Sequence, residues 1–494
     1  MHTRRYFHRL ACFTLALAAC FSAWAGSLPQ SVADALRKAD IPLSAISVYV
    51  QPLDGGAPVL SVNAAQPMNP ASTMKLVTTY AALESLGPGY TWKTGFWARG
   101  DIADGKLQGD LIVRGGGDPF LTLERVWLMQ RALRDRGVRE IRGNLVLDLT
   151  LYDLPPMDPG AFDGDALAAY NASPSSLVAD FNTQYVRLVP EVGGVAIRPE
   201  LPIAGTEFIS RLQLTEGACN SWRDDILASR PDPEMKEIVV FEGRYPRACG
   251  EKRLPLNLLP PAQNFAHVFR SLWEESGGKW GGAAVPGVAP PDTPPLLEFE
   301  SLPLGDIVRP LNKYSSNVMT RMLFLTLGQE KFGAPATPGK SVMAVREILG
   351  AHNLSFPELF LENGAGLSRN ERISAQSMGR LLLAAYASPH FSELESALPI
   401  AATDGTLKKR FNGSAFAGHA HLKTGSLRDV RALAGYLLDR NGRRLAVVMF
   451  VNHLNAKQST DAQAELLNWV YGRALPAASS CNCPPSTGMR APGS

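Results

Sequence analysis

Three short segments carry residues that could perform nucleophilic chemistry, and the first is Ser72-x-x-Lys75. Residues three apart share one face of a helix, so the Lys75 amine could lie beside the Ser72 hydroxyl. A serine attacks only after a base has taken its proton. A lysine can be that base if burial and nearby positive charge lower its pKa. Alone the pattern is weak, because Ser276-x-x-Lys279 also matches it and Ser72 could simply cap a helix.

The second segment is Ser315-Ser316-Asn317, which stands directly before the apolar run 318–327. A second hydroxyl could relay a proton between the base and the leaving group, and an amide could hold both the lysine and the substrate. The same Ser-x-Asn spelling recurs at Ser61 and Ser368, so a serine that caps a turn or a helix would explain any one of them.

The third segment is Lys423-Thr424-Gly425-Ser426, which precedes the apolar stretch 430–438. A lysine and a hydroxyl on an edge strand can bind a carboxylate, and a glycine lets the substrate backbone approach closely. Lys93-Thr-Gly has the same spelling at the start of another predicted strand. The spelling alone is therefore not specific.

The pattern around these segments predicts the elements that would position them. Pro70 and Gly87 flank an apolar-periodic stretch that runs to Leu86, which is typical of a helix that opens at Ser72. Four further elements follow from apolar patterning and turn residues: a hairpin of strands 45–50 and 59–62, helical structure over 310–327, a hairpin of strands 432–438 and 444–451 turned at Asn441-Gly442, and an amphipathic helix over 461–471.

The order and context of the three segments resemble the penicillin-binding proteins and serine β-lactamases. The large separation of Ser72 from Ser315 narrows the resemblance to the D-alanyl-D-alanine carboxypeptidase/endopeptidase family, the low-molecular-mass class C penicillin-binding proteins. The stretch 363–369 is similar to the family's Asp-Gly-Ser-Gly-Leu-Ser-Arg and departs from it at Asn363 and Ala365. Segments 115–119 and 404–407 also follow the family pattern.

The resemblance implies a catalytic role for five residues. Ser72 would attack the carbonyl between two D-alanines and become acylated, with Lys75 as its base. Ser315 and Asn317 would handle the proton of the leaving group and position the substrate. Lys423 would help to recognise the terminal carboxylate.

The resemblance also implies three substrate-binding residues. Thr424 would bind the terminal carboxylate together with Lys423. The backbone N–H groups of Ser72 and Ser426 would form the oxyanion hole. Arg369 would contact the substrate at the edge of the site.

The function implied is that of an exported serine D-alanyl-D-alanine carboxypeptidase/endopeptidase that acts on peptidoglycan stem peptides and is acylated by β-lactams. Two alternatives stay open. A secreted serine β-lactamase shares the three segments, but it would hydrolyse nitrocefin with fast turnover. A catalytically silent wall-binding protein with the same fold would take up no fluorescent penicillin. No metal or other cofactor is implied.

The implied fold is an α/β catalytic domain in which helices flank an antiparallel sheet. We expect this domain to comprise residues 26–95 and 296–475. A large, partly β-rich region over 96–295 would be inserted in it, and the family suggests that this region contains one domain nested in another. Residues 476–494 belong to a tail rich in Pro, Ser and Gly and are predicted to be disordered.

The N-terminus predicts export to the periplasm or cell envelope. A basic start, an apolar run over 10–20 and a small-x-small site at Ala23-Trp-Ala25 are typical of a signal peptide over residues 1–25. Lipidation at Cys20 or a retained N-terminal anchor are alternatives. No later stretch is long and apolar enough to predict a transmembrane helix.

The charge balance excludes one class of partner, and the cysteine content indicates a possible disulfide. The chain has 49 basic and 46 acidic side chains, and removal of the signal peptide takes away three arginines and no acid. The resulting neutral balance argues against nucleic acid as a partner. An oxidising compartment would permit a disulfide between Cys219 and Cys249.

Overall fold

The computed structural model describes residues 27–220, 222–231 and 238–473. The predicted signal peptide, Cys20 and the predicted disordered tail lie outside these residues. Within them, no helix combines the length and apolar character that a membrane crossing requires.

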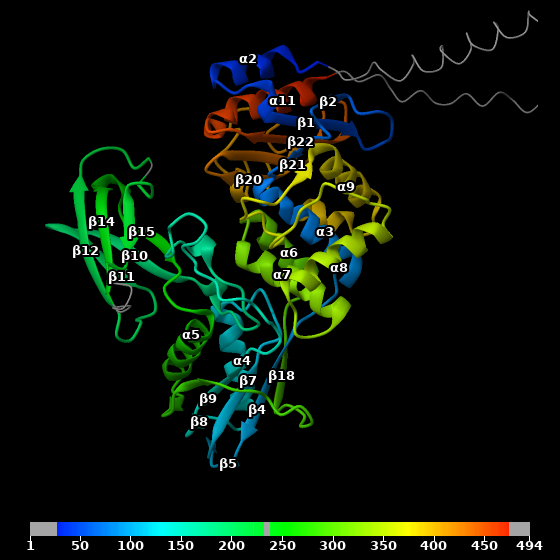
Figure 1. Cartoon of the computed structure of the whole chain (residues 1–494). Coiled ribbons are helices and arrows are strands. Elements are labelled where there is room, and N and C mark those ends of the chain that lie inside the picture. The colour runs from blue at the N-terminus through cyan, green and yellow to red at the C-terminus, as the bar shows by residue number, and fades with distance from the viewer. Residues whose placement is uncertain (1–26, 221, 232–237, 474–494) are drawn as a thin grey trace, which may run out of the picture.

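An antiparallel sheet of five strands forms the upper part of the molecule in Figure 1, in the order β2-β1-β22-β21-β20. These strands are β1 (Ile46–Pro52), β2 (Leu60–Val62), β20 (Ala420–Leu427), β21 (Val430–Leu438) and β22 (Arg444–Asn452). Both predicted hairpins are confirmed, since β1 pairs with β2 and β21 pairs with β22. The central strand β22 is buried along nearly its whole length because both faces of the sheet are covered.

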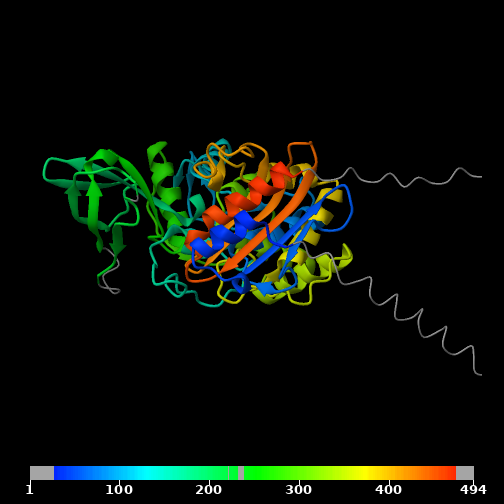
Figure 2. The same ribbon diagram turned by 90° about the horizontal axis from the view of Figure 1, so that it is seen from above.

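Helices cover the two faces of this sheet, as the sequence predicts. On one face lie α2 (Gln30–Lys38) and the predicted C-terminal helix α11 (Thr460–Gly472), which Figure 2 shows side by side. On the other face lies a larger group: α3 (Lys75–Leu86), α6 (Leu304–Lys313), α7 (Asn317–Phe332), α8 (Pro338–Ala351), α9 (Ala375–Ala387) and α10 (Phe391–Ala397). Separate hydrophobic clusters fill the two sides.

Two helix predictions differ from the structure in detail. The helix expected to open at Ser72 begins with a 3-10 turn, η2 (Ala71–Met74), before α3 starts at Lys75; such turns are frequent at helix N-termini. The helical pattern over 310–327 divides into α6 and α7, because Ser315 has a left-handed backbone with φ 59°. No i, i+4 ladder can continue through that conformation.

The chain between α3 and α6 forms a second body. Strand β4 (Lys93–Arg99) enters it and β18 (Leu297–Glu300) leaves it, and the two strands pair directly. Their sheet has the order β17-β9-β7-β4-β18 and includes β7 (Asp110–Arg114), β9 (Leu145–Asp148) and β17 (Ala284–Pro286). Its core also contains side chains of α4 (Leu123–Asp135) and α5 (Pro261–Glu275).

Residues 184–256 form a further β-rich lobe between β9 and α5, on the left of Figure 1. One sheet joins β10 (Gln184–Glu191), β11 (Gly194–Pro199) and β15 (Lys252–Leu256), and another joins β12 (Glu207–Thr215), β13 (Ile226–Ser229) and β14 (Ile238–Pro246). The lobe has its own hydrophobic cluster, and the expected Cys219–Cys249 disulfide is present in it.

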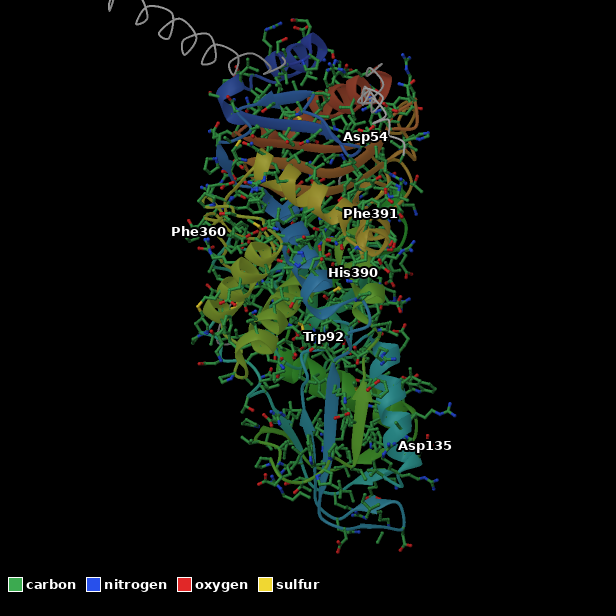
Figure 3. The ribbon with its side chains drawn as sticks, turned by 90° about the vertical axis from the view of Figure 1, so that its right-hand side faces the viewer. Asp54, Trp92, Asp135, Phe360, His390 and Phe391 are labelled. Carbon is green, nitrogen blue, oxygen red and sulfur yellow. A yellow bond between two sulfur atoms is a disulfide. The ribbon has the colours of Figure 1, made fainter. Side chains whose placement is uncertain are left out.

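Trp92 marks the junction of the catalytic part with the second body (Figure 3). Its side chain is buried, and its indole N–H donates to the Thr326 hydroxyl of α7 at 3.0 Å. Its backbone N–H donates to the Ser301 hydroxyl at 2.9 Å, next to the end of β18. The point where the chain enters the second body is therefore fixed to the point where it returns.

Candidate active site

Ser72 lies in the 3-10 turn η2, which is held in a strained conformation. Ala71 has φ 44°, and non-glycine residues adopt that region only when their surroundings enforce it. Asn69 supplies the constraint, because its Oδ1 accepts the Ala71 N–H at 2.9 Å and its Nδ2 donates to the Ser368 carbonyl at 2.9 Å. The turn is thus clamped to the loop that precedes β19 (Ile373–Ser374).

Two glycines allow neighbouring segments to approach this turn. A Cβ atom on Gly366 would lie 1.9 Å from the Ala71 carbonyl oxygen, and Gly366 also has φ 79°. A Cβ atom on Gly425 would lie 2.7 Å from the Pro70 carbonyl oxygen. Only glycine fits at these positions without a shift of the backbone, so the loop and strand β20 can border Ser72 directly.

Lys75 is fully buried beneath Ser72. Its Nζ lies 3.0 Å from the Ser72 Oγ, and it donates to the Asn317 Oδ1 at 2.7 Å and to the Ala365 carbonyl. An amide oxygen and a carbonyl oxygen can only accept hydrogen bonds. A neutral Lys75 amine would therefore give its two N–H groups to these acceptors and turn its lone pair to the serine hydroxyl.

The surroundings of Lys75 favour its neutral form. Burial is the main cause that holds the pKa of Lys75 well below the usual lysine range, and the positive charges of Lys423 and Arg321 act in the same direction. The carboxylate of Glu371 opposes them by raising this pKa. The charges of two cations and one acid thus shift the pKa of this amine in opposite directions.

Glu371 is a buried carboxylate that sequence reasoning did not identify. It lies two residues beyond the family-like stretch 363–369, which was the nearest available signal. Four backbone N–H groups donate to its two oxygens at 2.9–3.0 Å, those of Glu362, Asn363, Gly364 and Gly366. Glu371 therefore fixes the loop whose Ala365 carbonyl contacts Lys75.

Ser315 and Lys423 form a second linked pair. Ser315 occupies the break between α6 and α7, where Ser316 caps α7. The Nζ of the buried Lys423 donates to the Ser315 Oγ at 2.7 Å and to the Thr424 carbonyl at 2.9 Å. Burial lowers the pKa of Lys423 to about 7. The second and third segments of the sequence thus meet in space, although 108 positions separate these two residues.

The predicted site residues share one cleft of about 790 Å³. Ser72, Ser315, Asn317, Thr424 and Ser426 line it, and Lys75 and Lys423 lie buried next to these residues. The predicted edge residue Arg369 also lines the cleft, where it pairs with Asp429 at 3.0 Å and lies 4.5 Å from the ring centre of Phe162.

The second body contributes lining residues that sequence reasoning missed. Phe162, Asp163 and Tyr170 all line the cleft. The Tyr170 carbonyl accepts a hydrogen bond from the Asn317 Nδ2 at 2.9 Å, so this segment also orients a predicted site residue. No motif marked these residues, because their position depends on how the second body packs against α7.

The wall next to Thr424 holds a further group of missed residues. The Thr406 and Thr424 hydroxyl oxygens lie 2.8 Å apart. Thr406 belongs to the family-like stretch 404–407, which could have indicated it. Arg410, Arg428, Arg431 and Lys457 also line the cleft.

Two segments repeat the Ser-x-x-Lys and Lys-Thr-Gly patterns, and we call them the decoy segments. Both lie outside the cleft of Ser72. Ser276 follows the end of α5, where its hydroxyl donates to the Leu272 carbonyl at 2.7 Å. Lys93 begins β4 and pairs with Glu298 at 2.7 Å. Neither residue lines the cleft of Ser72. The structure thus brings the segments of Ser72, Ser315 and Lys423 to one cleft and places Ser276 and Lys93 outside its lining.

Comparisons with known proteins show which family the chain resembles over most of its length. The family model of the D-Ala-D-Ala carboxypeptidase 3 (S13) family matches residues 28–471. The D-alanyl-D-alanine carboxypeptidase DacB of Haemophilus influenzae is 26% identical over 395 residues, which cover 77% of this chain and 80% of that protein. The D-alanyl-D-alanine carboxypeptidase of an Actinomadura species is 29% identical over 398 residues, which cover 77% of this chain and 73% of that protein.

Solved structures show the same fold. The crystal structure of penicillin binding protein 4 from Haemophilus influenzae matches with a TM-score of 0.73 at 24% identity, over 90% of this chain and 99% of that chain. A second structure of that protein, complexed with a β-lactam, matches with a TM-score of 0.69 and the same coverage. The α/β fold expected from the sequence is thereby confirmed.

Proposed function

We propose a reaction for this chain, which belongs to the D-Ala-D-Ala carboxypeptidase 3 (S13) family. It is a serine peptidase that cleaves D-alanyl-D-alanine bonds of peptidoglycan stem peptides through an acyl-enzyme on Ser72. The observation that carries the proposal is the buried Lys75 amine, 3.0 Å from the Ser72 hydroxyl, with oxygen acceptors for its two N–H groups.

Acylation begins when Lys75 takes the proton of Ser72. The Ser72 Oγ then forms a bond to the carbonyl carbon of the penultimate D-alanine, and the developing oxyanion is bound by the backbone N–H groups of Ser72 and Ser426. The C–N bond breaks, and the proton that Lys75 took passes to the leaving amine through Ser315, which Lys423 contacts at 2.7 Å. Water then attacks the ester and gives one proton to Lys75, which returns it to the Ser72 oxygen as the acyl group leaves as a carboxylic acid.

Substrate binding uses the strand that carries Lys423. The Thr424 hydroxyl and the Lys423 ammonium bind the terminal carboxylate, and the Thr406 hydroxyl orients Thr424 from 2.8 Å. Asn317 links the substrate to Lys75 through its amide. Arg369 contacts the stem peptide at the cleft edge, where Asp429 and Phe162 hold its guanidinium.

β-Lactams act on this chain as covalent inhibitors. Their strained amide is attacked by Ser72 in the same way, but the leaving nitrogen stays attached to the acyl group and continues to occupy the leaving-group side of the cleft. The ester is then hydrolysed slowly. The structure of the Haemophilus influenzae protein with a β-lactam supports this inference.

The substrate implies that the mature chain works in the periplasm or cell envelope. Peptidoglycan lies outside the cytoplasm, and residues 1–25 have the pattern of an export signal. The Cys219–Cys249 disulfide is consistent with an oxidising compartment.

Intact-mass measurement with benzylpenicillin, followed by peptide mapping, tests the proposal. We expect the mass of one penicilloyl group on Ser72 in the wild type and in the decoy variant Ser276→Ala, and none in Ser72→Ala. Labelling of Ser72→Ala at another residue would overturn the site assignment. Fast nitrocefin turnover would instead favour a β-lactamase, and the absence of any adduct would favour a silent wall-binding protein.

Product analysis on muropeptides separates the two peptidase activities. Release of free D-alanine from pentapeptides reports carboxypeptidase activity, and conversion of cross-linked dimers to monomers reports endopeptidase activity. Ser72→Ala should lose both activities, because both require the same acyl-enzyme.

A further inference from the structure

One wall of the cleft carries positive charge without an acidic partner. We call Arg410, Arg431 and Lys457 the cationic wall; all three line the cleft. Within the part of the chain that the structure describes, none of them forms an ion pair within 4.0 Å. Arg410 donates to the Gln463 amide oxygen at 2.7 Å, and Arg431 donates to the backbone carbonyls of residues 427 and 430.

The cationic wall lies on the leaving-group side of the cleft. Arg410 follows the turn η6 (Gly405–Leu407), in which Thr406 contacts Thr424 at 2.8 Å. Arg431 stands opposite Ser426 in the pairing of β20 with β21. Because Thr424 binds the carboxylate of the departing residue in the proposed reaction, these cations border the space that the departing part occupies.

The guanidiniums of Arg410 and Arg431 repel each other. Burial and the positive charge of Arg431 lower the pKa of Arg410 to about 10, and burial also lowers the pKa of Arg431. Arginine side chains nevertheless keep their charge in proteins at neutral pH. A bound anion would offset this repulsion, and a wall that carries one sign of charge also attracts ligands of the opposite sign.

Two acids near the cleft, Asp163 and Asp429, form their contacts with groups outside the cationic wall. Asp163 lies on the second body, where it accepts hydrogen bonds from the Tyr170 hydroxyl at 2.8 Å and from the Asn171 Nδ2 at 2.9 Å. Asp429 pairs with Arg369. Neither acid forms an ion pair with the cationic wall.

We propose that the cationic wall binds additional carboxylates of the leaving group, so that the enzyme prefers substrates that release an acidic residue or peptide over those that release a residue with a single carboxylate. A lone D-alanine offers one carboxylate, which Lys423 and Thr424 already bind. An acidic leaving peptide, such as one released from a cross-link, offers further carboxylates for Arg410, Arg431 and Lys457. This inference rests on the proposed function and refines its substrate class.

Two peptides that differ only in the leaving residue test the inference. The first is N-acylated L-Lys-D-Ala-D-Glu and the second is N-acylated L-Lys-D-Ala-D-Gln, so the pair is matched in shape and differs by one carboxylate. For the wild type we expect kcat/KM to be about tenfold higher for the D-Glu peptide, the effect of one favourable charge contact of about 1.4 kcal/mol. The ratio should fall as salt is added.

The variants Arg431→Gln and Lys457→Gln, singly and together, should bring this ratio towards one. Lys457 is exposed, so its variant tests the wall with little risk to folding. Lys409→Gln is the matched control, because Lys409 is an exposed cation that does not line the cleft. We expect it to keep the wild-type ratio.

The outcomes distinguish the role of the cationic wall from the proposed reaction. Equal kcat/KM values for the two peptides in the wild type, or an unchanged ratio in the double variant, would overturn the role of the cationic wall and leave the proposed reaction standing. If neither peptide were cleaved and penicillin left Ser72 unmodified, the proposed function would fall and this inference with it.

Discussion

The Lys75 Nζ lies 3.0 Å from the Ser72 Oγ in a fully buried position, while its two other contacts are oxygen atoms of Asn317 and Ala365. This arrangement fixes the direction of the lysine lone pair through two oxygen acceptors, one of which lies in the loop that Glu371 holds. Burial and neighbouring positive charge lower the pKa of this amine and so favour its neutral form.

Replacement of the base should stop acylation and leave the fold in place. We expect Lys75→Met to lower the rate of penicillin labelling by about 10²–10⁴-fold, the usual contribution of general-base catalysis. Methionine fills a similar volume, but the Asn317 and Ala365 oxygens lose a donor. The free energy of unfolding should therefore fall by about 1–3 kcal/mol. Fluorescent penicillin uptake and urea unfolding measure the two effects.

Lys279→Met is the control for this change, because Lys279 belongs to the decoy segment with the same spelling. It should label at the wild-type rate. Normal labelling of Lys75→Met would show that another group takes the proton of Ser72.

The acid limb of the pH profile should report Lys75. As pH falls through the lowered pKa of Lys75, the amine gains a proton and the rate of acylation falls. The positive charge of Lys423 helps to keep that pKa low, so Lys423→Met should raise the pKa of Lys75 and move the acid limb to higher pH. Stopped-flow acylation by a chromogenic β-lactam between pH 4 and 9 measures this position independently of the maximum rate.

The control for this shift is Lys93→Met, a decoy lysine with the same Lys-Thr-Gly spelling whose side chain is paired on strand β4. Its acid limb should coincide with that of the wild type. An acid limb that stayed in place or moved to lower pH in Lys423→Met would contradict the electrostatic coupling of the two lysines.

Whether a contact in this site could be predicted from the sequence depended on how far apart its two residues lie along the chain. The contact of Ser72 with Lys75 is local, so the spacing along one helical turn was sufficient to suggest it. The contact of Lys423 with Ser315 required the sheet topology, which came from family resemblance. The division of the helix at Ser315 was missed, because residue types alone do not mark the left-handed backbone at that serine.

Other residues could not be predicted for a different reason. Glu371 accepts hydrogen bonds from backbone N–H groups. The positions of these groups depend on the loop conformation, which the residue types do not indicate. Phe162 and Tyr170 reach the cleft only because the second body packs against α7. Arg410 joins the cleft through a turn that the pattern of apolar residues does not describe.

Neutralisation of Glu371 should move the acid limb in the opposite direction. Its negative charge raises the pKa of Lys75, so Glu371→Gln should lower that pKa and extend acylation to lower pH. The glutamine nitrogen cannot accept a hydrogen bond, and loss of one such bond should cost about 1–3 kcal/mol of stability. The same stopped-flow profile and urea unfolding provide both readouts.

Glu362→Gln is a matched control, because Glu362 lies in the same loop and contacts Ser368 and Asn370 rather than Lys75. It should leave the acid limb unchanged. If Glu371→Gln lowered the maximum rate without a shift of the limb, the carboxylate would act only by holding the loop.

The disulfide should affect stability and leave the chemistry unchanged. Cys219 and Cys249 are 30 positions apart and lie in the hydrophobic cluster of the β-rich lobe, which shares no residue with the cleft. A loop of this length predicts a loss of about 3–4 kcal/mol of stability in a Cys219→Ser, Cys249→Ser variant. The loss should appear as an earlier urea transition of the lobe, followed by the 19F resonance of Trp222 in fluorotryptophan-labelled protein, because Trp222 packs against Tyr245 in that cluster. At urea concentrations below this transition, penicillin should label Ser72 at the wild-type rate. A reductant should lower the urea midpoint of the lobe in the wild type and leave the midpoint of the variant unchanged. Slower labelling of the folded variant would instead show that the lobe helps to shape the active site.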